Sequence, residues 1–258
     1  MDLDPAAIAR AALILRGSRR VLFITGAGLS ADSGLPTYRG VGGLYDGQVT
    51  DLGIPIEEAL SGDMVRAAPE ITWRYIAEVE SRCRGARPNR GHEVITEMER
   101  TLEHVVTLTQ NVEGLHQAAG ARNVIDIHGD VHRLVCMGCG SREHVESYLG
   151  LAIPPLCPCG AVMRPEVVLF GEPLPLDRVV RLEAELERGF DVIFSVGTSS
   201  LFPYISGPVI EAAERGVPTI EINPGLTEVS DVVALRIASP AAPALDAIWQ
   251  ACRPSSAR

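Results

Sequence analysis

Short apolar runs rich in branched side chains alternate with helical patterns along most of this 258-residue chain. The runs at 21–25, 104–109, 123–127, 191–197 and 217–223 predict strands. Several are nearly all apolar, which is typical of strands in a parallel sheet covered on both faces. The stretches 70–84 and 205–216 have the residue pattern of helices. The alternation predicts an α/β fold, a Rossmann-like doubly wound parallel sheet.

One stretch interrupts this alternation. Residues 130–163 contain four of the six cysteines, together with several glycines and prolines, and are poorly suited to core strands of the main sheet. We therefore expect a main domain at 1–129 and 164–258, with a helical insertion at about 41–90. Residues 130–163 are predicted to form a small inserted module that needs a covalent or metal staple.

The four clustered cysteines fall into two close pairs, Cys136-x2-Cys139 and Cys157-x-Cys159, each beside glycines. A tetrahedral zinc ion takes four thiolates at about 2.3 Å, and paired cysteines on tight turns supply them. Such pairs indicate metal before disulfide in a chain that stays inside the cell. No position is left open for water, so the expected zinc is structural. The alternative is four unligated cysteines.

The charge and the first residues limit the class of partner. A net charge of −10 argues against nucleic-acid binding, which usually shows a basic surface, and mildly favours cationic partners. No run of about 18 apolar residues predicts a membrane span. The N-terminal segment has acids first and arginines last, the reverse of a signal peptide, so we expect a cytoplasmic protein. The same segment predicts a helix from near Pro5 to Gly17.

A glycine-rich segment at 26–40 follows the first predicted strand. Gly26 and Gly28 would let the backbone approach a pyrophosphate, and the next helix would supply free N–H groups. The dinucleotide fingerprint GxGxxG has Ala31 at its third glycine, and no acidic residue follows a second strand to hold a ribose. This argues against a dehydrogenase. A GxG alone also occurs in ordinary turns.

The longer string GAGLSADSGLPTYRG, residues 26–40, resembles the signature GAGxSxxSGxPxFRG of the sirtuins, NAD-dependent protein-lysine deacylases. Tyr38 stands where the family has Phe, which keeps the ring. The string TQNVEGLH at 109–116 follows a strand end and is similar to the sirtuin TQNxDGLH. Glu113 replaces the Asp that is thought to hold the nicotinamide carboxamide. A contact misplaced by about 1 Å can cost roughly 100-fold in rate.

His128 follows another predicted strand and precedes Gly129. A single histidine is more often structural, but imidazole titrates near neutrality and can accept a proton at physiological pH. The sirtuin resemblance implies that His128 is the general base and that Asn111 and Arg39 order the cofactor and its loop. These three are the catalytic candidates. His116 is expected to support structure.

The string MRPEVVLFGE at 163–172 is similar to the sirtuin LRPDVVxFGE segment, and its VVLF run predicts a strand. The resemblance implies that an acylated peptide adds as a strand beside it, with modest sequence selectivity, and that Phe170 lines the acyl-lysine tunnel. An ordinary strand and turn is the alternative. The substrate-binding candidates are Val168, Phe170, Gly171 and Glu172.

Two further loops at strand ends, 197–199 and 222–224, are similar to the family's GTS and IN motifs at the adenosine ribose, although such residues are also ordinary in loops. Residues 200–204 depart from the usual continuation, and Ala241 is expected near the adenine. The NAD-binding candidates are Gly26, Ala27, Gly28, Ser30, Asp32, Pro36, Tyr38, Arg39, Gln110, Asn111, Glu113, His128, Gly197, Thr198, Ser199, Asn223, Pro224 and Ala241.

The resemblance runs from about residue 21 to residue 223. It implies a deacylase, with deacetylation foremost, that uses NAD as co-substrate and releases nicotinamide and O-acyl-ADP-ribose from acylated lysine-containing proteins or peptides. Sirtuins that remove succinyl groups carry Tyr-x-x-Arg after the cofactor loop. The nearest match here is Tyr75-x-x-Glu78, so we expect neutral acyl groups; the alternative is that Arg74 or Arg82 nearby supplies the cation. The alternatives are an ADP-ribosyltransferase or NAD hydrolase on the same scaffold, and a non-catalytic NAD and zinc interaction module.

Overall fold

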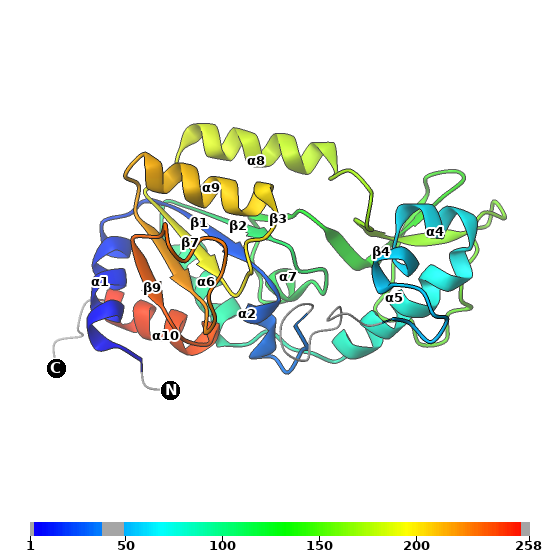
Figure 1. Cartoon of the computed structure of the whole chain (residues 1–258), viewed down its shortest axis with the longest axis horizontal. Helices are drawn as coiled ribbons and strands as arrows, with labels where there is room; N and C mark the ends of the chain where they lie inside the picture. The colour runs from blue at the N-terminus through cyan, green and yellow to red at the C-terminus, as the bar shows by residue number, and fades with distance from the viewer. Residues whose placement is uncertain (1–2, 38–48, 254–258) are drawn as a thin grey trace.

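A six-stranded sheet forms the larger part of the computed structural model, which describes residues 3–37 and 49–253 (Figure 1). All of its strand pairs are parallel. The strand order reverses beside β1, as in a doubly wound sheet, so the predicted Rossmann-like α/β fold is confirmed. The order is β3 (Val124–Asp126), β2 (His104–Thr109), β1 (Arg20–Thr25), β7 (Val192–Val196), β8 (Thr219–Ile222) and β9 (Leu235–Ile237).

Helices cover both faces of this sheet (Figure 1), which explains why most residues of β1, β2, β7 and β8 are buried and why these strands are rich in apolar residues. Side chains of β1 alternate between two cores: Phe23 packs in one, and Leu22 and Ile24 in the other. The first core takes α1 (Pro5–Arg16), α6 (Arg90–Thr101) and α10 (Ala241–Cys252), and the second takes α8 (Leu176–Arg188) and α9 (Pro203–Glu214).

The predicted first helix is confirmed, and its ends have the expected chemistry. The Asp4 carboxylate accepts a hydrogen bond from the N–H of Ala6, and Pro5 occupies the first helical position. Gly17 caps the other end. Among the helices of the described residues, none combines the length and apolarity needed to cross a bilayer.

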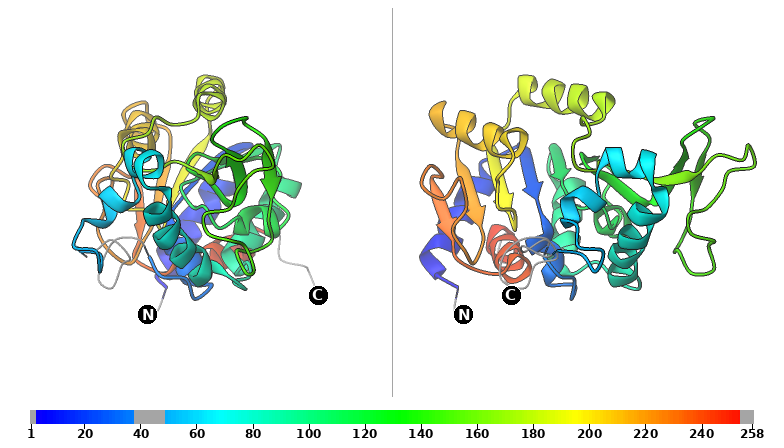
Figure 2. Two further views of the ribbon diagram at one scale, coloured as in Figure 1. Left: turned by 90° about the vertical axis from the view of Figure 1, so that its right-hand side faces the viewer. Right: turned by 45° about the vertical axis from the view of Figure 1, so that its right-hand side comes forward.

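A smaller body lies beside one end of the parallel sheet (Figure 2). Its antiparallel sheet has the order β5 (Arg142–His144), β4 (Gly129–Cys136) and β6 (Met163–Val167). The helices α3 (Ile56–Ala59), α4 (Gly62–Ala67) and α5 (Pro69–Cys83) share one hydrophobic core with it. The helical insertion and the cysteine-rich segment thus bury each other's apolar surface. The division of the chain at 129/130 and 163/164 stays a prediction.

The indole N–H of Trp73 on α5 donates to the Met163 carbonyl at 2.8 Å, which joins the helical insertion to the cysteine-rich segment. The strand predicted over 167–170 is wrong beyond Val167, where β6 ends. From there the backbone crosses between two partners: Val168 N–H donates to the His128 carbonyl, and Phe170 N–H donates to the Leu60 carbonyl. Residues 168–170 are therefore extended, but they bridge the two bodies instead of continuing one sheet.

Candidate active site

The loops that follow β1 and β7 touch through their backbones. The N–H of Gly28, in the short helix α2 (Ala27–Ala31), donates to the Gly197 carbonyl at 2.8 Å. A Cβ at Gly28 would lie 2.7 Å from the Gly197 Cα, so no side chain fits there. Gly197 itself has a φ of +59°, which favours glycine. This contact lies where the strand order reverses, the place at which open α/β sheets bind ligands.

A cleft of about 780 Å³ lies at this edge of the sheet and extends to the smaller body, whose residues Leu60, Ile76 and Val167 also line it. It brings together predicted residues that lie far apart in the sequence. Those of the NAD-binding set are Gly26, Ala27, Gly28, Asp32, Gln110, Asn111, His128, Gly197, Thr198, Ser199, Asn223 and Pro224. The four substrate-binding candidates, Val168, Phe170, Gly171 and Glu172, line the same cleft.

The remaining candidates lie elsewhere. Ala27 also lines a second, smaller pocket, which contains Ser30, Pro36 and Glu113. Ala241 begins α10 and is buried beside Pro240, which lines the cleft. Tyr38 and Arg39 lie outside the described residues.

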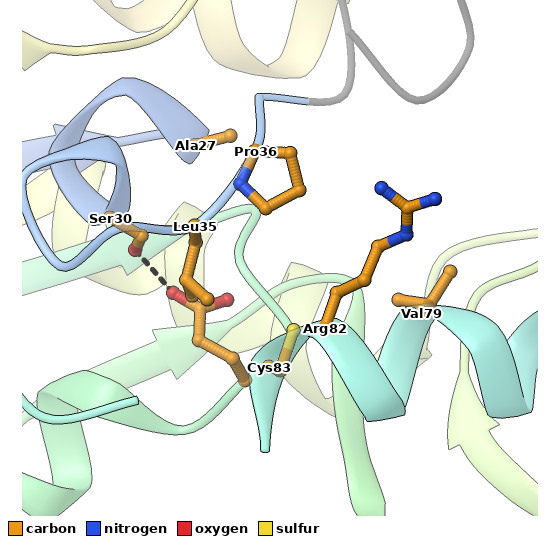
Figure 3. A pocket seen from close by; sticks show the side chains of 8 residues that line it. Ala27, Ser30, Leu35, Pro36, Val79, Arg82 and Cys83 are labelled. Carbon is orange, nitrogen blue, oxygen red and sulfur yellow. Dashed lines mark hydrogen bonds between the residues drawn. The ribbon is translucent and has the colours of Figure 1, made fainter. Parts of the chain in front are cut away.

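The small pocket has a volume of about 10 Å³, room for about one water molecule (Figure 3). Ser30 Oγ donates to Glu113 Oε1 at 2.5 Å across its floor. Burial raises the pKa of the Glu113 carboxyl, and the bond from Ser30 opposes that rise. Arg82 and Cys83 approach from the last turn of α5. Burial, with the Glu113 charge next in importance, raises the pKa of the Cys83 thiol to about 12, which keeps it protonated.

Asn111 connects the two pockets. Its Nδ2 donates to the Gly26 carbonyl at 3.1 Å and to Ser30 Oγ at 3.0 Å. These two bonds fix the amide plane. Its Oδ1 is buried and has no hydrogen-bond partner, and an unpaired buried acceptor is costly. The Asn111 side chain is therefore prepared to accept a hydrogen bond from a ligand in the cleft.

His128 lies at the junction of the two bodies. Its Nδ1 is 3.1 Å from the Gln110 carbonyl, and its Nε2 is 2.7 Å from the Tyr204 hydroxyl. Burial lowers the pKa of His128 to about 4, so the ring is neutral at pH 7 and can accept a proton. The next residue must be glycine, because a Cβ at Gly129 would lie 1.9 Å from the Glu166 carbonyl oxygen.

The cleft wall on the smaller body is apolar, and α5 supplies part of it through Ile76 and Val79. The predicted pair on this helix is not in the wall. Tyr75 donates its hydroxyl to Asp51 at 2.6 Å, and Glu78 is exposed. Among the described residues that line the cleft there is no arginine or lysine.

Several lining residues were not identified from the sequence. They include Leu60, Ile76, Val79, Phe202 and Tyr204. Helical spacing was a usable signal only for Ile76 and Val79, three residues apart on one face. Phe202 and Tyr204 lie within residues 200–204, which depart from the family pattern, and that pattern therefore assigns them no function.

The four cysteines Cys136, Cys139, Cys157 and Cys159 meet at one end of the smaller body, with all Sγ atoms within 4.8 Å of one another. The Cys136–Cys159 and Cys139–Cys157 sulfur distances are 3.4 and 3.7 Å. Four thiolates about 2.3 Å from one zinc ion lie roughly 3.8 Å apart, so the cluster fits a tetrahedral zinc site. The short Cys157-x-Cys159 turn is closed by a 2.8 Å bond from Gly160 N–H to the Cys157 carbonyl.

Comparison with known proteins identifies the family. A family model described as "Sir2 family" matches residues 26–202, more than half of the chain. This chain belongs to the Sir2 family. The NAD-dependent protein deacylase 2 of Pseudomonas aeruginosa is 48% identical to this Sir2 protein over 234 residues, 89% of this chain and 91% of the relative. The NAD-dependent protein deacylase of Aquifex aeolicus is 34% identical over 235 residues, 90% and 95% of the two chains.

Solved Sir2 structures share the fold. A mutant Sir2 homologue in complex with ADP-ribose has a TM-score of 0.85 at 34% identity, covering 95% of this chain and 96% of that one. A Sir2 homologue in complex with NAD has a TM-score of 0.83 at 34% identity, covering 95% and 93%. The sirtuin resemblance of the glycine-rich segment is therefore confirmed for the chain as a whole.

Proposed function

We propose that this Sir2 protein is an NAD-dependent protein-lysine deacylase. The observation that carries the proposal is the convergence of three features in one cleft. The backbone contact of Gly28 with Gly197 lies at the switch point of the sheet, His128 lies at the junction of the two bodies, and the 168–172 segment forms the facing wall. The relatives' names and the ADP-ribose and NAD complexes of similar structures support the same activity.

In the proposed reaction, the acyl oxygen of the modified lysine attacks the ribose carbon that bears nicotinamide, and the carbon–nitrogen bond breaks. Nicotinamide leaves as a neutral molecule. Asn111, held by Gly26 and Ser30, orients the ribose through its unpaired Oδ1. His128 Nε2 removes a proton from a ribose hydroxyl, whose oxygen attacks the imidate carbon. Water then completes the reaction, giving free lysine and O-acyl-ADP-ribose.

The acyl group of this substrate is neutral. The wall that receives it contains Leu60, Ile76, Val79 and Phe170, and the two acidic residues of the cleft are engaged. Asp32 accepts from the N–H of Ala242, and Glu172 is paired with Arg164. Since a buried carboxylate without a partner is costly, a succinyl group has no favourable position among these residues.

One mass-spectrometric assay tests the proposal. Purified protein is incubated with NAD and an acetyl-lysine peptide, and nicotinamide, free peptide and O-acetyl-ADP-ribose are followed together. The chain contains no lysine, so every acyl-lysine that disappears comes from the peptide. We expect equal amounts of the three products. Nicotinamide release that does not depend on peptide would instead indicate an NAD hydrolase. ADP-ribose joined to protein would indicate an ADP-ribosyltransferase, and the replacement of the family's Asp by Glu113 makes both activities alternatives.

A further inference from the structure

The hydroxyl of Tyr204 lies 2.7 Å from Nε2 of His128, although the two residues are 76 positions apart in the chain. The opposite ring nitrogen, Nδ1, faces the Gln110 carbonyl at 3.1 Å. A carbonyl only accepts, so Nδ1 carries the hydrogen. In the neutral imidazole Nε2 is then the acceptor, and the Tyr204 hydroxyl donates to it.

The surrounding structure holds Tyr204 in this place. It lies in the first turn of α9, where the Ile205 and Ser206 N–H groups both donate to the Phe202 carbonyl. The Phe202 ring stacks on the Tyr204 ring, with centroids 5.4 Å apart and an interplanar angle of 10°. Phe202 also meets the His128 ring edge-on. One aromatic side chain therefore supports both partners of the hydrogen bond.

The turn before Phe202 has an unfavourable backbone conformation. Ser200 has a φ of +55° and is fully buried. Its N–H donates to Thr198 Oγ1 at 3.1 Å, and that same oxygen accepts from Gln110 Nε2 at 2.7 Å. A serine in this region of φ persists only where its surroundings over-determine it. Gln110 thus binds the His128 ring through its carbonyl and the loop leading to Tyr204 through its side chain.

The nitrogen Nε2 has a single lone pair, so a ribose hydroxyl and the Tyr204 hydroxyl cannot both donate to it. We propose that Tyr204 is a positioning residue for His128: it donates to Nε2 before NAD arrives and accepts the Nε2 hydrogen after proton transfer. This inference rests on the proposed role of His128 as general base.

Every proton is accounted for in the proposed steps. A ribose hydroxyl replaces Tyr204 as donor, Nε2 takes the ribose proton, and the ribose oxygen leaves to attack the imidate carbon. The new Nε2–H then lacks its partner. The Tyr204 hydroxyl, which both donates and accepts, rotates to accept it and stabilises the imidazolium.

The variant Tyr204→Phe tests the inference, because it keeps the stacked ring and removes only the hydroxyl. Tyr75→Phe is the matched control, since it removes a tyrosine hydroxyl bonded to Asp51 and outside the cleft. For Tyr204→Phe we expect kcat to fall about 3- to 10-fold, the effect of one hydrogen bond, with no rise in the KM for NAD. A merely structural role would raise the KM, because the Gly197–Ser199 loop would lose its order, and that result would overturn the inference.

A second measurement does not depend on activity. In protein labelled with ¹⁵N-histidine and free of NAD, the His128 resonances of the wild type and of Tyr75→Phe should show the Nδ1–H tautomer. In Tyr204→Phe the Nε2 resonance should move, because its donor is gone. An unchanged Nε2 resonance together with a kcat within twofold of wild type would overturn the inference. If the wild type lacks deacylase activity while Tyr204→Phe still moves the Nε2 resonance, the proposed function is contradicted and the contact is established.

Discussion

Ser30 donates a 2.5 Å hydrogen bond to Glu113 in a pocket with room for about one water molecule, and Asn111 donates to the same serine oxygen. The carboxylate that replaces the family's Asp therefore extends across the pocket floor to Ser30. Because burial raises the pKa of Glu113 and the serine bond opposes the rise, this bond helps the group stay ionised. If nicotinamide binds in this pocket, as the sirtuin resemblance implies, the longer side chain occupies space that an aspartate would leave to it.

Glu113→Asp should make the enzyme more sensitive to nicotinamide. The shorter carboxylate frees space beside Ser30, and we expect the half-inhibitory nicotinamide concentration to fall at least about 3-fold, the equivalent of less than one hydrogen bond. Deacylation measured over a nicotinamide series checks this. Glu113→Gln is the control, because it keeps the length and removes the charge. Equal sensitivity in the wild type and Glu113→Asp would contradict this account of the pocket.

His128→Ala should lower deacylation by about 10²- to 10⁴-fold, the usual contribution of a general base. NAD binding should persist, because the other lining residues remain. Single-turnover assays and calorimetric titration with NAD separate the two effects. The control is His144→Ala, which removes an exposed histidine from β5. Substantial deacylation by His128→Ala would exclude the general-base role.

Val79→Arg should let the enzyme accept succinyl-lysine. The wild type is expected to favour acetyl over succinyl peptide by at least about tenfold in kcat/KM, since a buried carboxylate lacks a partner. An arginine at this cleft-lining position of α5 supplies the missing cation. Glu78→Arg adds the same group to the exposed face of the helix and should change nothing. A wild-type preference for succinyl peptide would refute the prediction.

Loss of the cysteine cluster should unfold the smaller body first. The core around Trp73 is shared by α3–α5 and the antiparallel sheet, whereas the parallel sheet has two cores of its own. Cys139→Ser should lower the bound zinc and destabilise the smaller body by several kcal/mol. Denaturant unfolding followed by tryptophan fluorescence should then show an early transition from Trp73. Cys252→Ser, which alters a cysteine outside the cluster, should retain zinc; a single unshifted transition in Cys139→Ser would contradict a structural metal.

Stability should fall as the pH drops below about 6.5. Burial lowers the pKa of His92 and His128 to about 4, and it also holds the pKa of His116 well below its usual value. The unfolded chain, with ordinary histidine pKa values near 6.5, therefore binds more protons than the folded protein. Each histidine then contributes up to about 1.4 kcal/mol per pH unit between pH 6.5 and its folded pKa, and the raised pKa of Glu113 acts in the opposite direction.

Denaturant midpoints measured from pH 7.5 to pH 5 check this dependence. Substituting the exposed His144 with glutamine should leave the curve unchanged. A free energy of unfolding that stays constant over this range would show that the buried rings do not stay neutral in the folded protein.

The sequence was sufficient to predict elements whose pattern repeats locally. The strands around Phe23 and Phe194 are mostly apolar because both of their faces are covered, and this pattern can be read from the sequence without knowing the tertiary contacts. The two cysteine pairs were equally predictable, because each pair lies within four consecutive residues. Loop motifs at strand ends also converged as expected, because the carboxyl ends of parallel strands share one edge.

Contacts set by packing between distant segments were not predictable. The face of α5 that lines the cleft depends on how Trp73 docks against Met163, so Ile76 and Val79 were not assigned to the cleft from the sequence alone. The Tyr204 contact with His128 depends on the unusual φ of Ser200 between β7 and α9. No local pattern reports either relationship.

Helix α5 packs in the core of the smaller body through Trp73, lines the wide cleft with Val79 and reaches the small pocket with Cys83. One helix therefore contacts both pockets. If an acylated peptide bound in the cleft displaces this helix, a ligand of the small pocket would change the affinity for that peptide by the same factor as the peptide changes the affinity for the ligand. For the proposed deacylase, the choice of substrate and the strength of inhibition by nicotinamide would then be linked, and selection acting on one of them would also change the other.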